Sequence, residues 1–186
     1  MDDRHSSSSP LLRGDEVLLV VIDMQERLLP VIAEKEKVVE NTLKLVTFAR
    51  MIGVPIIITE QENLGETIPE IRAKLEAIQP IAKLEFDCFE SPAFVEHIRR
   101  INRSTIIIAG IETHICVAQT ALHALVDYRV QVLSDAVSSR SPHNRAVAID
   151  RMRQAGVTIT STEMVIYELL GTAGTDQFKE VLKLVK

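Results

Sequence analysis

The chain of 186 residues is 46% hydrophobic, 25% charged and 4% aromatic, which predicts one globular domain with a substantial core. Its formal charge of −5, together with the lack of a Lys/Arg cluster, speaks against nucleic acid as a partner. No apolar run approaches the roughly 20 residues that span a bilayer, so we expect no membrane partner.

The N-terminus and the cysteines indicate where the protein works. Residues 1–14, MDDRHSSSSPLLRG, lack an apolar segment and predict a flexible arm rather than a secretory signal. Residues 15–186 are predicted to form the single domain. Two cysteines, Cys88 and Cys116, make no disulfide framework, which favours a reducing, cytoplasmic location.

Short β-branched runs alternate with helical patterns along the chain. Strands are expected at residues 16–23, 54–59, 80–84, 104–110, 129–135 and 157–162. Helices are expected at residues 38–52, 67–78 and 91–101, in a segment that carries Cys116 and runs to about residue 127, and at residues 141–156, 163–171 and 175–185. Ser91 is expected to cap its helix, with Pro92 at the first helical position. This order predicts a parallel sheet with helices on both faces, a three-layer α/β/α sandwich.

Three chemically active side chains fall at one edge of this predicted sheet. Asp23 ends the first strand, Lys83 lies near the end of the third, and Cys116 follows the fourth. Ligands bind outside the carboxyl ends of the strands in such sheets. A lysine between Asp23 and Cys116 would keep the carboxylate ionised. Together with the positive end of the helix dipole, it would also favour the thiolate.

Each of these residues also has a purely structural interpretation. Asp23 can cap a turn, Lys83 can extend from an edge strand into solvent, and Cys116 can fill a gap in the core. Cys88 is interpreted as a packing residue. His114 flanks Cys116 but ranks below Asp23 as a base, and no group of residues has metal-ligand spacing.

Four motifs occur in order between about residues 17 and 170. They are VVIDMQ with Asp23, KLEFDCF with Lys83, GIETHICV with Cys116, and the stretch DAVSSRSPHNRAVAIDRMRQAGVTITST. Together they resemble the isochorismatase-like cysteine hydrolases, the superfamily that includes nicotinamidases and N-carbamoyl amidohydrolases.

The resemblance implies a six-stranded parallel sheet in the order 3-2-1-4-5-6 and a cysteine hydrolase mechanism. Asp23 would accept the thiol proton, and Lys83 would stabilise the negative charges of the thiolate and of Asp23. Cys116 would attack an amide or ureido carbonyl to form a thioester-type intermediate. Backbone N–H groups near Cys116 would hold the oxyanion, beside a cis peptide bond that maps to Ile111–Glu112. The resemblance also implies a small-molecule substrate and a homo-oligomer.

One segment departs from the nicotinamidases. ITEQENLGETIPEI contains no histidine where those enzymes carry metal ligands, so we expect no metal and no cofactor. The TEQ sequence is closer to small isochorismatase-domain hydrolases. Gln25, Gln61 and Phe86 are expected to line the substrate pocket.

Other functions stay open at this point. One is a non-catalytic interaction protein on the same fold, and another is a thiol redox sensor with Cys88 as the resolving thiol. Isochorismate hydrolysis is a further alternative, although it cleaves a vinyl ether and is not obviously a thiol reaction. The superfamily name therefore does not fix the substrate.

Overall fold

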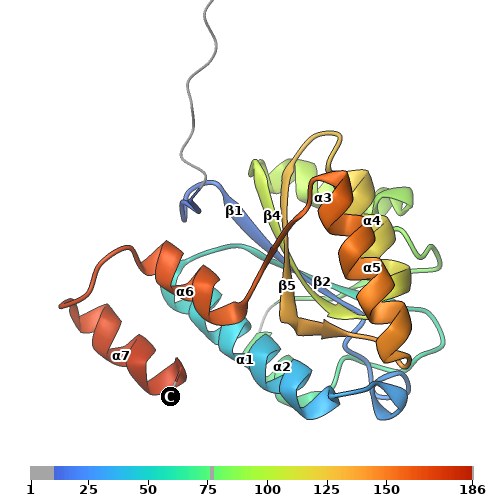
Figure 1. The fold of residues 1–186 in the computed structure, drawn as a ribbon, viewed down its shortest axis with the longest axis horizontal. Helices are drawn as coiled ribbons and strands as arrows, with labels where there is room; N and C mark the ends of the chain where they lie inside the picture. Colours follow the sequence, from blue (N-terminus) through green and yellow to red (C-terminus); the bar gives the residue numbers. More distant parts are fainter. Residues whose placement is uncertain (1–10, 76–77, 186) are drawn as a thin grey trace, which may run out of the picture.

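A parallel β-sheet forms the centre of the computed structural model, which describes residues 11–75 and 78–185 (Figure 1). The described residues form six strands in the order β3-β2-β1-β4-β5-β6, which confirms the predicted fold. The strands are β1 (Val17–Ile22), β2 (Ile56–Gln61), β3 (Ile81–Lys83), β4 (Thr105–Ile111), β5 (Arg129–Ser138) and β6 (Thr158–Thr160). Every residue of β1 and β4 is buried, as expected of central strands covered on both faces.

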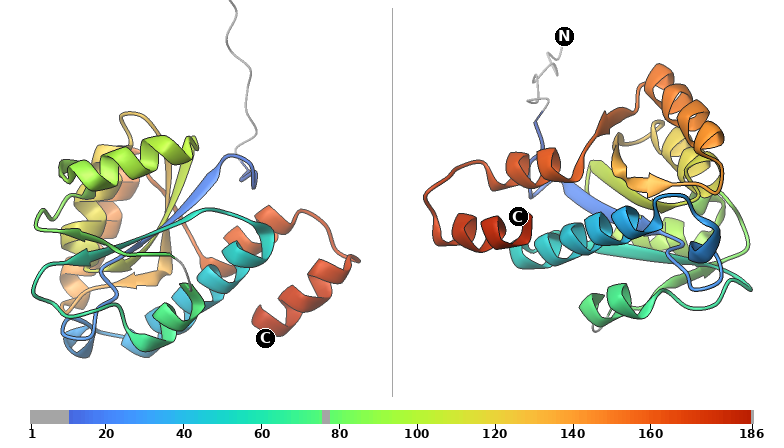
Figure 2. Two further views of the ribbon diagram at one scale, coloured as in Figure 1. Left: turned by 180° about the vertical axis from the view of Figure 1, so that it is seen from behind. Right: turned by 60° about the horizontal axis from the view of Figure 1, so that its bottom comes forward.

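Helices cover both faces of the sheet (Figures 1 and 2). One face carries α1 (Lys35–Ile52), α2 (Pro69–Leu75) and α6 (Thr162–Leu170), with α7 (Asp176–Val185) outside them. The other face carries α3 (Pro92–Ile101), α4 (Ala118–Ala124) and α5 (Pro142–Ala155). Three short helical turns, η1 (Leu29–Val31), η2 (Cys88–Glu90) and η3 (Thr113–Val117), lie in the connections. None of the helices described in residues 11–75 and 78–185 has the length and hydropathy needed to cross a bilayer.

The C-terminal helix packs against its own chain. Val181 of α7 forms a small buried cluster with Phe48 of α1 and Ile166 of α6. This contact covers part of the apolar surface of α6 and α7. Met164 and Tyr167 of α6 remain 55% and 38% exposed.

Several predicted boundaries differ from the structure. β5 continues past the expected end at Asp135 to Ser138, because its pairing with β4 shifts register between Ile108 and Gly110 and then resumes. The Asp135 carboxylate is accommodated because it accepts hydrogen bonds from the backbone N–H and hydroxyl of Thr162. Ser91 stands at the N-cap of α3 but makes no side-chain capping bond.

The predicted N-terminal arm lies mostly outside the described residues, which start at residue 11. Its last part is ordered. Leu12 is 5% exposed, and its N–H donates to Glu168 Oε2 of α6 at 3.2 Å. The domain therefore begins earlier than the predicted residue 15.

Gly110 of β4 pairs with Ile22 of β1. Its φ is 120°, and a Cβ at this position would lie only 2.6 Å from the backbone nitrogen of Ile22. Ile22 immediately precedes Asp23, so the absence of a side chain at residue 110 sets the backbone spacing beside the candidate site.

Gly110→Ala is expected to lower the free energy of unfolding by about 3 kcal/mol, because the methyl group overlaps backbone that cannot move aside. Urea unfolding followed by circular dichroism measures this change. Gly156→Ala is the matched control, since Gly156 has a φ of 107° but open space around its Cβ position. Equal losses in the two variants would show that backbone strain, rather than the close approach, accounts for the effect.

Candidate active site

Asp23, Lys83 and Cys116 come together at the carboxyl edge of the sheet. Lys83 Nζ lies 2.8 Å from Asp23 Oδ2 and 3.8 Å from Cys116 Sγ. The three residues are 0%, 2% and 5% exposed. They come from the end of β1, the end of β3 and the η3 turn after β4, so the topology of the sheet places an ammonium between a carboxylate and a thiol.

The backbone and two hydrogen bonds orient Asp23. Its φ is 50°, a left-handed conformation that Asp adopts more readily than most residues. Oδ1 accepts a hydrogen bond from the Thr59 hydroxyl at 2.7 Å, and Oδ2 accepts from Lys83. The carboxylate therefore binds side chains of neighbouring strands instead of capping a turn.

Lys83 does not extend into solvent, because its side chain is fully buried in the ion pair with Asp23. Its ammonium also donates to Gln61 Oε1 at 2.8 Å and to the Glu85 carbonyl at 3.2 Å. Burial lowers the pKa of Lys83, but the charges of Asp23 and Cys116 outweigh burial and leave that pKa above its usual value. Lys83 is therefore a fixed cation.

Cys116 lies in η3, a π-helical turn between β4 and α4. Burial raises the pKa of its thiol most strongly, and the Asp23 carboxylate raises it further. Lys83 lowers this pKa, but by less than burial and Asp23 raise it. Lys83 favours the thiolate, as expected, but burial and Asp23 outweigh it. The resting thiol therefore keeps its proton.

Cys88 lies in the core and is a packing residue, as predicted. It is fully buried in the hydrophobic cluster that contains Phe94 and Ile98, and its backbone N–H donates to Thr120 Oγ1 at 3.0 Å. Burial raises the pKa of its thiol to about 12.

The peptide bond between Ile111 and Glu112 is cis, at the position that the sequence resemblance implies. The Glu112 carboxylate is 2% exposed and accepts from the Arg140 backbone N–H at 2.8 Å and from Arg140 Nη2 at 2.5 Å. Burial acts to raise the pKa of Glu112, but the hydrogen bonds from Arg140 outweigh it and lower that pKa. This ion pair ties the residue before the η3 turn to the loop after β5.

His114 turns toward this same loop. Its Nδ1 lies 2.9 Å from Ser139 Oγ, and the residue lines a hollow of about 250 Å³ with Ala118, Asn144 and Val147. This placement supports Asp23, rather than His114, as the base for Cys116.

The three expected pocket residues have different surroundings. Gln25 is fully buried, and its amide binds the backbone of Gln61 and Gly65. Gln61 binds Lys83 directly. Phe86 follows β3 on the loop beyond Lys83 and is 53% exposed.

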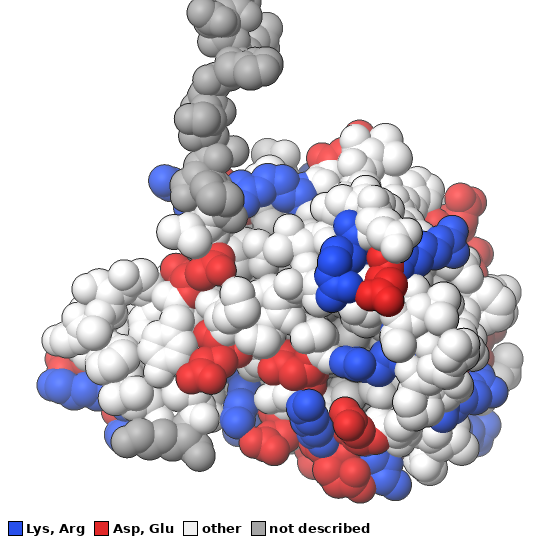
Figure 3. Space-filling model, viewed as in Figure 1, with Lys and Arg blue, Asp and Glu red and all other residues white. Residues whose placement is uncertain are grey.

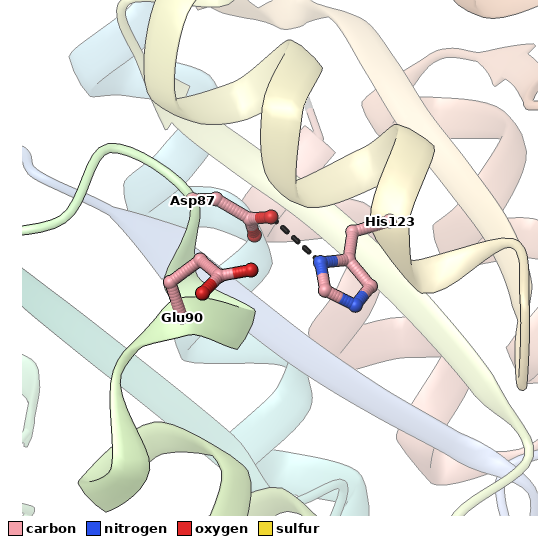
Figure 4. Close-up of side chains that lie close together, drawn as sticks. All are labelled: Asp87, Glu90 and His123. Atoms are coloured by element: carbon pink, nitrogen blue, oxygen red, sulfur yellow. Dashed lines mark hydrogen bonds and ion pairs between the residues drawn. The ribbon is translucent and has the colours of Figure 1, made fainter.

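Figure 4 shows a second polar cluster, formed by Asp87, Glu90 and His123. Potential ligand atoms of Asp87, Glu90 and His123 lie within 4.8 Å of one another, which corrects the expectation that no residues form a metal-ligand group. Spacing could not show it, because His123 is on α4 and the acids lie around η2. Asp87 Oδ2 and His123 Nδ1 are 2.7 Å apart, and the His123 ring stacks on Phe89. In this structure these contacts link η2 to α4.

Comparisons with a family model and with individual relatives identify the same family. The model of the Isochorismatase domain matches residues 17–164. The secreted isochorismatase effector Isc1 of Phytophthora sojae is 38% identical over 178 residues, which cover 91% of this chain and 84% of that protein.

Solved structures share the fold over nearly the whole chain. A structure described as MAR1 ribonuclease from Caenorhabditis elegans is 33% identical, with a TM-score of 0.88 and coverage of 94% of this chain and 92% of that one. YcaC of Escherichia coli, described as an octameric hydrolase of unknown specificity, is 26% identical with a TM-score of 0.89, over 96% and 92% of the two chains. YcaC of Pseudomonas aeruginosa, solved with hexane-2,5-diol and covalent acrylamide, has the same identity and TM-score over 96% and 93%.

Proposed function

Because this chain belongs to the isochorismatase domain family, we propose that it is a cysteine hydrolase that cleaves an amide or ureido C–N bond of a small molecule. The observation that carries this proposal is the position of the Lys83 ammonium, 2.8 Å from the Asp23 carboxylate and 3.8 Å from the Cys116 sulfur. A packing cysteine has no need of a buried ion pair beside it, since removing that pair from water is costly.

The proposed reaction begins with proton transfer from the Cys116 thiol to Asp23 as sulfur attacks the substrate carbonyl carbon. Lys83 stabilises the negative charge that develops on sulfur, and backbone N–H groups of the η3 turn stabilise the oxyanion. Collapse of the tetrahedral adduct breaks the C–N bond, and the amine leaves with the proton held by Asp23. Water, deprotonated by Asp23, then hydrolyses the thioester, and the returned proton regenerates the thiol.

The raised pKa of the Cys116 thiol is compatible with this sequence of steps. A neutral resting thiol protects the nucleophile, and Asp23 accepts its proton only when the substrate is in place. The P. aeruginosa YcaC structure with covalent acrylamide supports the proposal by similarity, because acrylamide is an electrophile of the kind that thiolates attack.

A panel of small amides, ureido acids and isochorismate tests this function, with Cys116→Ala as the blank. Release of an amine or ammonia by the natural sequence and not by the blank is the expected result. Turnover of isochorismate alone would replace C–N cleavage with vinyl-ether cleavage. Reversible Cys88–Cys116 bonding under peroxide, without turnover of any compound, would favour the redox sensor.

Ribonuclease activity is a second candidate, because the C. elegans relative is described as a ribonuclease. On the face in Figure 3, basic and acidic side chains lie interspersed, and the chain carries 21 basic against 26 acidic residues. Phosphate binding needs clustered positive charge, so we favour the small-molecule substrate. If RNA cleavage persists in Cys116→Ala and its rate stays proportional to the amount of this protein through successive purification steps, the small-molecule proposal is overturned.

Activity is expected to survive treatment with EDTA. The Lys83 ammonium lies 3.8 Å from the thiol and repels a cation there. Turnover before and after chelation, with metal analysis of the same sample, measures this. Loss of activity that returns with zinc would contradict the proposed mechanism.

We expect the protein to form a homo-oligomer. The octameric E. coli relative supports this, as do the exposed apolar residues Leu84 and Phe86 beside Lys83. Light scattering at micromolar concentration should give at least twice the monomer mass, and a monomer would refute the proposal. A cytoplasmic location stays a prediction, since one relative is named a secreted effector.

A further inference from the structure

The Lys83 ammonium has a defined set of acceptors. Its N–H groups face Asp23 Oδ2 at 2.8 Å, Gln61 Oε1 at 2.8 Å, the Glu85 carbonyl at 3.2 Å and Cys116 Sγ at 3.8 Å. Of the three oxygen acceptors only the Asp23 carboxylate carries charge. Gln61 therefore satisfies a buried donor without adding a second negative charge beside the thiol.

Gln61 is held firmly in this orientation. Its Nε2 donates to the Leu84 carbonyl at 2.7 Å, which leaves Oε1 facing Lys83. The buried Gln25 amide binds both backbone groups of Gln61: Nε2 donates to its carbonyl at 2.9 Å, and Oε1 accepts from its N–H at 2.8 Å. Gln25 Nε2 also donates to Gly65 O at 2.7 Å, so it ties the end of β2 to the following loop.

We propose that Gln61 is a positioning residue for Lys83, and that Gln25 in turn positions Gln61. The neutral amide directs the ammonium into the space between Asp23 and Cys116 and leaves its positive charge available to the sulfur. A carboxylate at residue 61 would pair with the ammonium and offset part of its electrostatic effect on the sulfur. The inference rests on the proposed function in one respect, because it assumes that Cys116 reacts as a nucleophile.

The rate of Cys116 alkylation by iodoacetamide tests this role without a known substrate. The pH dependence of that rate, followed by peptide mass spectrometry, is compared for the natural sequence, Gln61→Glu and Gln61→Met. Gln61→Glu is expected to react about tenfold more slowly at a given pH, since its profile moves by about one unit to higher pH. Gln61→Met removes the acceptor but adds no charge, so it is expected to react more slowly with a smaller displacement of the profile.

Asn63→Asp is the matched control, because Asn63 is exposed on the loop that follows β2 and gains the same charge. Its profile is expected to stay unchanged. Thermal melts of all variants identify those whose fold is lost, and only folded variants enter the comparison. If Gln61→Glu and Asn63→Asp have the same alkylation profile as the natural sequence, Gln61 does not position Lys83.

The outcome for positioning is separate from the outcome for hydrolysis. A displaced profile in Gln61→Glu supports the positioning role even if the panel yields no substrate. If a substrate is found, Gln61→Glu should lower kcat and move its pH profile in the same direction while KM changes little. A change in KM alone would make Gln61 a substrate contact and overturn the proposal.

Discussion

Cys116→Ala is expected to lower kcat/KM by roughly 10,000-fold or more on the substrate that the panel identifies. The substitution removes the atom that forms the covalent intermediate, and no neighbouring side chain replaces it. Cys116→Ser is expected to be almost as inactive, because a hydroxyl gives up its proton far less readily than a thiol. Steady-state kinetics on purified protein measures both losses.

Cys88→Ala is the control for this experiment. Cys88 is fully buried in the core, so its loss leaves a small cavity and is expected to lower stability by about 1 kcal/mol while kcat/KM changes little. Full activity in Cys116→Ser, or equal losses in Cys88→Ala and Cys116→Ala, would exclude Cys116 as the nucleophile.

Asp23→Asn and Lys83→Met extend the same prediction to the partners of the thiol. Each is expected to lose most of the activity, since the ion pair between them acts as a unit with Cys116. Effects within such a unit are far from additive, so the double variant should be little worse than either single variant. Additive losses would indicate that the residues act independently.

The sequence predicts the sheet well because its strands are continuous apolar runs. A run such as VLLVVI of β1 has no solvent-facing alternation, which only a strand covered on both faces tolerates. The candidate site at this edge follows from the same reasoning, since Asp23 directly follows β1 and Cys116 lies in the turn after β4. The less regular parts were harder to predict. η3 is a π-helical turn, and no local propensity distinguishes it from the first turn of an α-helix.

The protonation of Cys116 could not be predicted from sequence, because it depends on a balance between groups far apart along the chain. The sequence shows that a lysine and a helix terminus are near the thiol, and both favour thiolate. The structure adds the burial of the sulfur and its contact with the charge of Asp23. Together these raise the pKa of the thiol above its usual value, although Lys83 lowers it. Gln61 was expected only as a pocket residue, since its bond to Lys83 joins two strands that the sequence separates by 22 residues.

Iodoacetamide is expected to modify Cys116 well before Cys88 in the folded protein. Cys116 is 5% exposed with a cation 3.8 Å from its sulfur, whereas Cys88 is 0% exposed, so the reagent reaches Cys116 more readily. Burial also raises the pKa of Cys116, so reaction near neutral pH should be slow and should accelerate as the pH rises. Peptide mass spectrometry over a time course at several pH values measures the two rates separately.

Lys83→Met is expected to slow the alkylation of Cys116, because it removes the cation that lowers the pKa of the thiol, and each unit of pKa corresponds to about a tenfold change at fixed pH. Lys179→Met is the matched control, since Lys179 is exposed on α7 and pairs with Asp176. A thermal melt shows whether Lys83→Met remains folded with Asp23 left unpaired. If Cys88 reacts first, or if a folded Lys83→Met reacts as fast as the control, Lys83 does not lower the pKa of the Cys116 thiol. Cys116 would then be a packing residue at the carboxyl edge of the sheet.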